Sequence, residues 1–97
     1  MKTYKFLKAA SIEVEESRSF YDEERLGLGA EFIDEIDATM YEVCKQPEIW
    51  RNVTPNIKRK SIDRFPFVVY YAIEEDCILV VAVAHQKRRP GYWKNRL

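Results

Sequence analysis

The chain has 97 residues, of which 46% are hydrophobic and 33% charged, with only three glycines and four prolines. This composition is typical of an ordered globular protein, and the length predicts a single domain over residues 1–97 rather than separate catalytic and regulatory domains. The charged N-terminus lacks the apolar core of a signal peptide, and no apolar run is long enough to span a membrane. We therefore expect a cytoplasmic protein without a membrane partner.

The two cysteines do not indicate a metal site. Cys44 falls in a predicted helix and Cys77 in a predicted strand, and neither belongs to a Cys-x-x-Cys motif or to a zinc-ligand spacing. We interpret both as reduced thiols of the core, and we expect neither a metal nor another cofactor.

The formal net charge is zero, but the charges are unevenly distributed along the chain. Residues 1–48 hold twelve acidic and six basic side chains, whereas residues 49–97 hold four acidic and ten basic ones. If the two halves occupy different faces, the molecule is a dipole that offers a positive surface to an anionic partner. The alternative is that the halves neutralise each other across the fold.

The first half of the chain predicts a strand followed by a helical hairpin. Residues 3–7 alternate as a strand does. From residue 10 to about Arg25 the spacing is helical, with one stripe of small and apolar side chains: Ala10, Val14, Ser17 and Tyr21. Gly27 and Gly29 can take the positive φ values that end a helix and reverse the chain. The second helix ends before Pro47 and has its own apolar stripe: Leu28, Phe32, Ile33, Ile36, Met40, Val43 and Cys44.

The second half predicts a loop and three strands. Residues 46–56 contain two prolines and no periodicity, so we expect a loop, with Trp50 and Val53 as anchors on the core. Strands are predicted at 57–62, 65–73 and 77–85, and the last two are apolar on both faces and therefore central. The expected fold is α+β, of order β-α-α-β-β-β, with the hairpin on one face of a mainly antiparallel four-stranded sheet. The first strand completes an edge or pairs with the last strand.

The C-terminal tail is the main candidate for chemistry. It contains no familiar catalytic motif, but His85 ends an apolar strand and is followed by Arg88 and Arg89. If the protein is a nuclease, His85 acts as general acid or base and Arg88 stabilises charge that develops on a phosphate. The alternative is that His85 is a structural residue at the strand end.

Basic and aromatic side chains of the second half are the candidates for contact with an anionic target. The predicted target-binding residues are Lys58, Lys60, Arg64, Arg89, Tyr92, Trp93 and Arg96. Lysines also protect an edge strand from aggregation, which is the alternative interpretation of Lys58 and Lys60. An aromatic pair at the end of the chain can instead pin the C-terminus to the core.

The order of these segments resembles the RelE/ParE toxin superfamily over nearly the whole chain. The most specific pieces are Arg-Phe-Pro-Phe at residues 64–67 and Ala-His-Gln-Lys-Arg-Arg-Pro at residues 84–90. The resemblance implies the toxin of a type II toxin–antitoxin module, a plasmid stabilisation protein, neutralised by a small antitoxin that wraps around it.

The resemblance implies two different activities. RelE-like members cut mRNA on the ribosome, whereas ParE-like members poison DNA gyrase. The arginine that RelE-like members carry just inside the third strand falls at Phe67 or Val68 in this sequence. We therefore favour a ParE-like toxin that inhibits an essential macromolecule, with gyrase as the expected target. An mRNA endoribonuclease and a non-toxic interaction module remain as alternatives.

Overall fold

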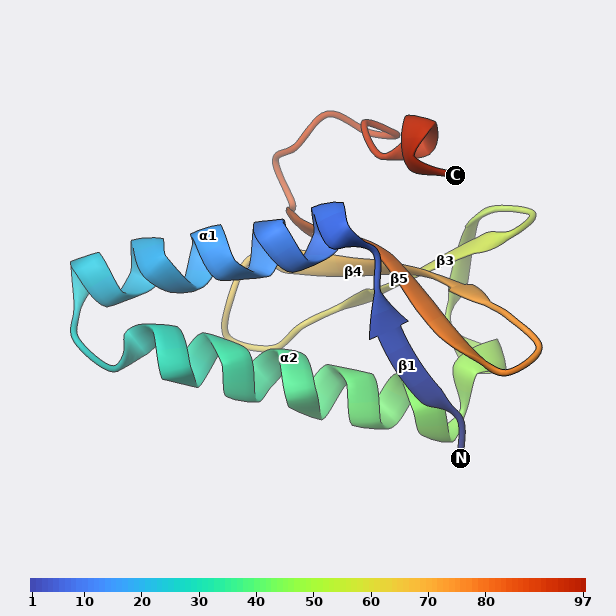
Figure 1. Ribbon diagram of the computed structural model, residues 1–97, viewed down its shortest axis with the longest axis horizontal. Helices are drawn as coiled ribbons and strands as arrows, with labels where there is room; N and C mark the ends of the chain where they lie inside the picture. Colours follow the sequence, from blue (N-terminus) through green and yellow to red (C-terminus); the bar gives the residue numbers. More distant parts are fainter.

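The computed structural model describes all 97 residues and contains two long helices and a five-stranded sheet (Figure 1). The elements in chain order are β1 Thr3–Phe6, α1 Lys8–Glu24, α2 Leu28–Lys45, the 3-10 turn η1 Pro47–Ile49, β2 Arg51–Thr54, β3 Ile57–Ser61, β4 Phe67–Ile73, β5 Cys77–His85 and the 3-10 turn η2 Lys94–Arg96. The strands lie in the order β1-β5-β4-β3-β2. The predicted α+β class is confirmed, and so is the pairing of the first strand, which runs parallel to β5 at one edge of the sheet.

The prediction of four strands was wrong, because β2 lies inside the segment 46–56 that we expected to be a loop. β2 pairs antiparallel with β3 and forms the other edge of the sheet. Three of its four residues are exposed, so it carries no alternation of buried and polar side chains. Such a pattern leaves no signal of a strand in the sequence, and the flanking Pro47 and Pro55 favour a loop.

The helical hairpin covers one face of the sheet, as expected. In Figure 1, α1 and α2 run antiparallel to each other on one side of the sheet, and α1 passes in front of part of β4. The main core lies between these layers and includes Phe32, Met40, Val69, Tyr71 and Val80, each fully buried. Neither α1 nor α2 combines the length and the apolar composition that a membrane-spanning helix requires.

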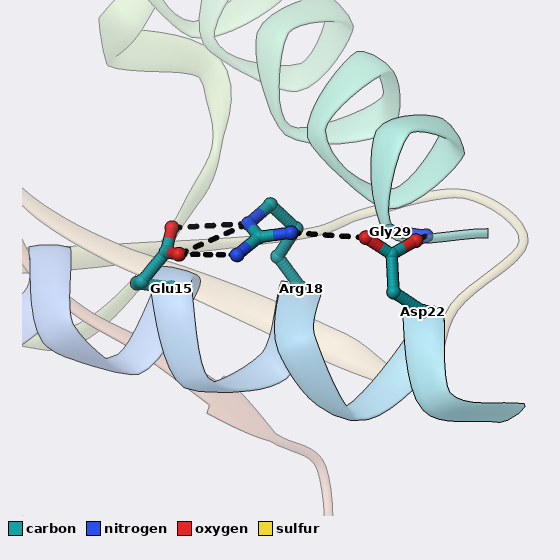
Figure 2. A network of polar contacts seen from close by, with 4 residues as sticks. All are labelled: Glu15, Arg18, Asp22 and Gly29. Carbon is teal, nitrogen blue, oxygen red and sulfur yellow. Dashed lines mark hydrogen bonds and ion pairs between the residues drawn. The ribbon is translucent and has the colours of Figure 1, made fainter. Parts of the chain in front are cut away.

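The two helices approach each other closely at their connection, and two glycines have different roles there. Gly27 has a φ of 91°, as the sequence suggested. Gly29 does not take a positive φ but lies in the first turn of α2, where an added Cβ would stand 2.5 Å from the carbonyl oxygen of Arg18. Figure 2 shows the polar network at this contact: Arg18 bridges Glu15 and Asp22, and Asp22 accepts the Gly29 N–H at 2.8 Å.

The C-terminal tail covers part of the opposite face of the sheet. Trp93 is 1% exposed and packs with Ile57, Val81 and Ala82 in a second, smaller core. Its ring lies 5.2 Å from the ring of Tyr70. The tail is therefore a structural layer, because its largest side chain fills the sheet face that the helices leave open.

Candidate functional site

The end of β5 is anchored to the beginning of β4. Phe67 and His85 are register partners, and their rings meet edge to face with centroids 5.4 Å apart. The N–H of Gln86 donates to the carbonyl of Pro66 at 2.8 Å, and Nδ1 of His85 accepts the N–H of Lys87 at 3.1 Å. One imidazole nitrogen is thus used to hold the turn that follows the strand.

A small hollow lies beside His85, between α1 and the strand ends. It has a volume of about 320 Å³ and is lined by Glu16, Ser17, Phe20, Tyr21, Phe67 and His85. Phe20 is 57% exposed although it is a large apolar residue. The hollow therefore combines an imidazole, a carboxylate and exposed aromatic surface.

Glu13 of α1 is the centre of the polar cluster behind this end of the sheet. Its carboxylate accepts hydrogen bonds from the N–H of Val83 at 3.0 Å, the hydroxyl of Tyr92 at 2.6 Å and both terminal nitrogens of Arg96 at 2.9 and 2.8 Å. Arg96 also donates to the carbonyl of Val81 at 3.0 Å. Because the pairing of β1 with β5 ends at Val80, Glu13 and Arg96 supply partners to backbone groups that have no strand beside them.

These contacts change the ionisation of the groups that make them. Burial of the Glu13 carboxyl opposes its ionisation, but hydrogen bonds from Arg96, Tyr92 and Val83 outweigh this and hold its pKa below the ordinary value of 4.5. Burial and the hydrogen bond to Glu13 raise the pKa of Tyr92. Tyr92 is therefore a neutral donor at physiological pH, and Glu13 is a charged acceptor.

Two arginines flank the ring of Tyr92. The guanidinium carbon of Arg88 lies 3.9 Å from the ring centroid, and that of Arg96 lies 5.0 Å from it. Arg88 is exposed and makes no ion pair, whereas the Arg96 side chain is only 20% exposed and is paired with Glu13. Arg88 thus presents its charge at the surface while its guanidinium is held against an aromatic face.

The other predicted target-binding residues do not gather at this place. Lys58 and Lys60 point to the face that the helices cover, since their register partners on β4 are Tyr71 and Val69. The amine of Lys58 donates to the carbonyl of Trp50 at 2.8 Å, and that of Lys60 lies 4.6 Å from the Trp50 ring.

Arg64 is held by the second helix. It has a φ of 70° and pairs with Glu31 at 2.5 Å and with Glu35 at 3.5 Å. Together with the Arg96–Glu13 and Lys60–Glu42 pairs, these contacts join the acidic and the basic half of the chain. The neutralisation considered in the sequence thus occurs in part, because Arg51, Arg59 and Arg89 make no ion pair.

The predicted residues of the C-terminal segment therefore differ in how accessible they are. The side chains of Arg88 and Arg89 are exposed and make no ion pair, and His85 and Tyr92 are partly accessible at the end of β5. Trp93 and Arg96 bind the tail to the rest of the protein. No group of three or more His, Cys, Asp or Glu side chains is arranged to hold a metal ion.

Glu13 was not predicted from the sequence. It follows Ala10 by three residues and precedes Ser17 by four, so it borders the apolar stripe of the first helix. An acid at such a position signals a buried partner, although the sequence does not say that the partner is Arg96.

Both the fold and the sequence of the chain are similar to those of known proteins. In the fold, the chain is similar to a solved structure described as "Chromosomal ParDE TA system from P. aeruginosa", with a TM-score of 0.76, 11% sequence identity, and coverage of 88% of this chain and 96% of the other. Residues 4–90 match the family described as ParE toxin of type II toxin-antitoxin system, parDE. The chain belongs to this ParE toxin family. A search of proteins with curated functions found no significant match.

Proposed function

We propose that this protein acts in the cytoplasm as a ParE-like toxin that arrests growth by binding and inhibiting DNA gyrase, and that a cognate antitoxin neutralises it. The residues at the beginning of β4 favour binding of a target over cleavage of RNA. The positions at which a RelE-like arginine is expected hold Phe67 and Val68, which are 8% and 2% exposed. No cation can approach a scissile phosphate from these positions, since apolar side chains fill them.

The groups at the end of β5 also favour binding. The hydroxyl of Tyr92 donates its hydrogen bond to the Glu13 carboxylate. His85 uses Nδ1 to hold the following turn. By contrast, the cations of Lys87, Arg88 and Arg89 are exposed on that turn, where they can meet acidic groups of a protein target without any rearrangement.

The test compares the two activities of the same purified protein. We expect it to inhibit supercoiling by purified gyrase and to leave mRNA intact on translating ribosomes. The Arg89→Gln variant should weaken inhibition about tenfold, and the His85→Ala variant should weaken it much less. Cleavage of mRNA that disappears in His85→Ala would overturn the proposal.

A RelE-like endoribonuclease is the second candidate, and one observation favours it. His85 and Glu16 line the same hollow, and an imidazole and a carboxylate in one site can serve as general acid and general base. The ribosome assay above decides between the two. If expression in a host without the antitoxin causes no growth arrest, both toxins are excluded and the non-toxic interaction module is the remaining function.

A cognate antitoxin is the second binding partner that we propose for this protein. The genome offers a direct test: a short reading frame should adjoin this one, and its product should bind this protein and restore growth when the two are expressed together. If the adjoining product does not bind the purified protein, neutralisation by a neighbouring antitoxin is contradicted.

A further inference from the structure

Two arginines lie directly opposite each other at the edge of the sheet farthest from β1. Arg51 of β2 and Arg59 of β3 are register partners, so their side chains share one face. This is the face opposite the helices, because Arg59 is the register partner of Tyr70, whose ring packs on Trp93. Like charges in this position repel each other, and neither arginine makes an ion pair within the chain.

A hollow lies beside this pair of arginines. The hollow measures about 360 Å³ and is lined by Trp50, Arg51, Arg59, Lys60 and Ser61. The amine of Lys60 is held over the Trp50 ring, and its nearest carboxylate, on Glu42, is 3.8 Å away. The ammonium group of Lys60 is thus on the helix-covered face and is paired with Glu42, so the uncompensated charge at this recess comes from Arg51 and Arg59.

We propose that this recess binds an extended acidic segment of a partner protein, with a carboxylate held between Arg51 and Arg59. A guanidinium presents two parallel N–H donors that match the two oxygens of a carboxylate. No strand lies beyond β2, so backbone groups on its outer side have no strand partner within the sheet. An extended segment can pair with such an edge while its alternate side chains reach the arginines.

The charges around the recess favour a polypeptide over a nucleic acid. The whole chain has a formal net charge of zero, whereas nucleic-acid binding generally relies on an extended basic surface. Glu42 and Asp63 line a second hollow that also contacts Trp50. A continuous phosphate backbone that passed the recess would meet these carboxylates, but a peptide can place a single acid at the arginines and neutral residues beside the acids.

The proposed function suggests the antitoxin as the partner that supplies this segment, and to that extent the inference rests on it. The binding chemistry does not depend on the identity of the partner, so it can be measured with a defined probe. We would use a fluorescently labelled peptide of alternating glutamate and valine and compare it with a peptide of alternating lysine and valine and with a single-stranded oligonucleotide of similar length.

The variants Arg51→Gln and Arg59→Gln remove one cation each, and Arg25→Gln is the matched control because Arg25 is an exposed arginine in the connection between the helices. In fluorescence anisotropy, we expect the acidic peptide to bind the natural protein and each recess variant to weaken binding by about tenfold, with Arg25→Gln unchanged. Thermal unfolding of the variants shows that the fold is retained.

Three results would overturn this inference. They are no binding of the acidic peptide, equal loss in Arg25→Gln, and binding of the oligonucleotide rather than the peptide through the two arginines. Failure of the proposed function is distinguishable from these results. If the protein binds the peptide through Arg51 and Arg59 but leaves gyrase supercoiling unchanged, the peptide-binding recess is supported and gyrase is rejected as the target.

Discussion

The carboxylate of Glu13 and the guanidinium of Arg96 form two parallel contacts of 2.9 and 2.8 Å between residues 83 positions apart in the sequence. The side chains are only 13% and 20% exposed, so the charges interact in surroundings that are largely shielded from water. This pair joins the first helix to the end of the chain. It therefore helps to hold the tail, with Tyr92 and Trp93, on the sheet.

Replacement of Glu13 should destabilise the protein strongly. Glu13→Ala leaves Arg96, the Tyr92 hydroxyl and the Val83 N–H without their acceptor, and we expect the free energy of unfolding to fall by roughly 2–4 kcal/mol. Urea unfolding followed by circular dichroism measures this change. Glu23→Ala is the control, because Glu23 is an exposed acid on the same helix, and it should change stability by less than about 0.5 kcal/mol. Equal effects in the two variants would contradict the role of Glu13.

The Glu13 carboxylate should make the free energy of unfolding depend on pH in the acidic range. The pKa of Glu13 is lowered in the folded protein, so the unfolded chain binds a proton more readily. Its contribution is present above its ordinary value of 4.5 and is lost as the pH falls through the folded pKa. In Glu13→Gln we expect a smaller loss of stability on acidification than in the natural protein. Urea midpoints measured on both proteins from neutral to acidic pH test this, and parallel curves would rule it out.

Fluorescence quenching can report the position of the tail. The chain has two tryptophans, so the Trp50→Phe variant emits from Trp93 alone. Trp93 is 1% exposed and should be protected from iodide. Adding Glu13→Ala to this variant should release the tail and raise the quenching constant several-fold while the helices remain folded. If Trp93 is already quenched freely in Trp50→Phe, the tail does not cover the sheet in solution.

Gly29→Ala should destabilise the protein, although the same change normally stabilises a helix. The new Cβ would lie 2.5 Å from the Arg18 carbonyl oxygen and 2.7 Å from the Asp22 carboxylate, so the two helices must move apart. We expect a loss of about 1–3 kcal/mol, against a gain of about 0.5–1 kcal/mol at an open helical position. Chemical unfolding decides the sign. A stabilised variant would show that the helices do not approach closely here.

Arg89 should affect binding without affecting stability. It is exposed and makes no ion pair, so Arg89→Gln should unfold like the natural protein within about 0.5 kcal/mol. If the turn after β5 contacts the target, inhibition of gyrase should require about tenfold more of the variant. Lys45→Gln, which removes an exposed cation at the end of α2, is the control and should inhibit normally. Loss of inhibition in both variants would indicate a general effect of charge.

The sequence predicted the elements whose signals are local. The stripes at helical spacing in α1 and α2 and the apolar runs of β4 and β5 are confirmed, because each pattern records which side of one element is buried. The segments at residues 64–67 and 84–90 likewise carried the family resemblance. β2 was missed because an exposed edge strand gains its structure from pairing with β3 rather than from burial of its own side chains.

The fold class, the two helices and the buried strands were thus determined by the sequence alone. The hydrophobic effect favours apolar residues on the buried side of each element, so their spacing along the sequence shows the type of element. Only the tertiary structure decided the five-strand count, the close approach at Gly29, the Glu13–Arg96 pair and the facing arginines Arg51 and Arg59. Each of these depends on which residues the folded chain brings together, and no spacing within a single segment records that.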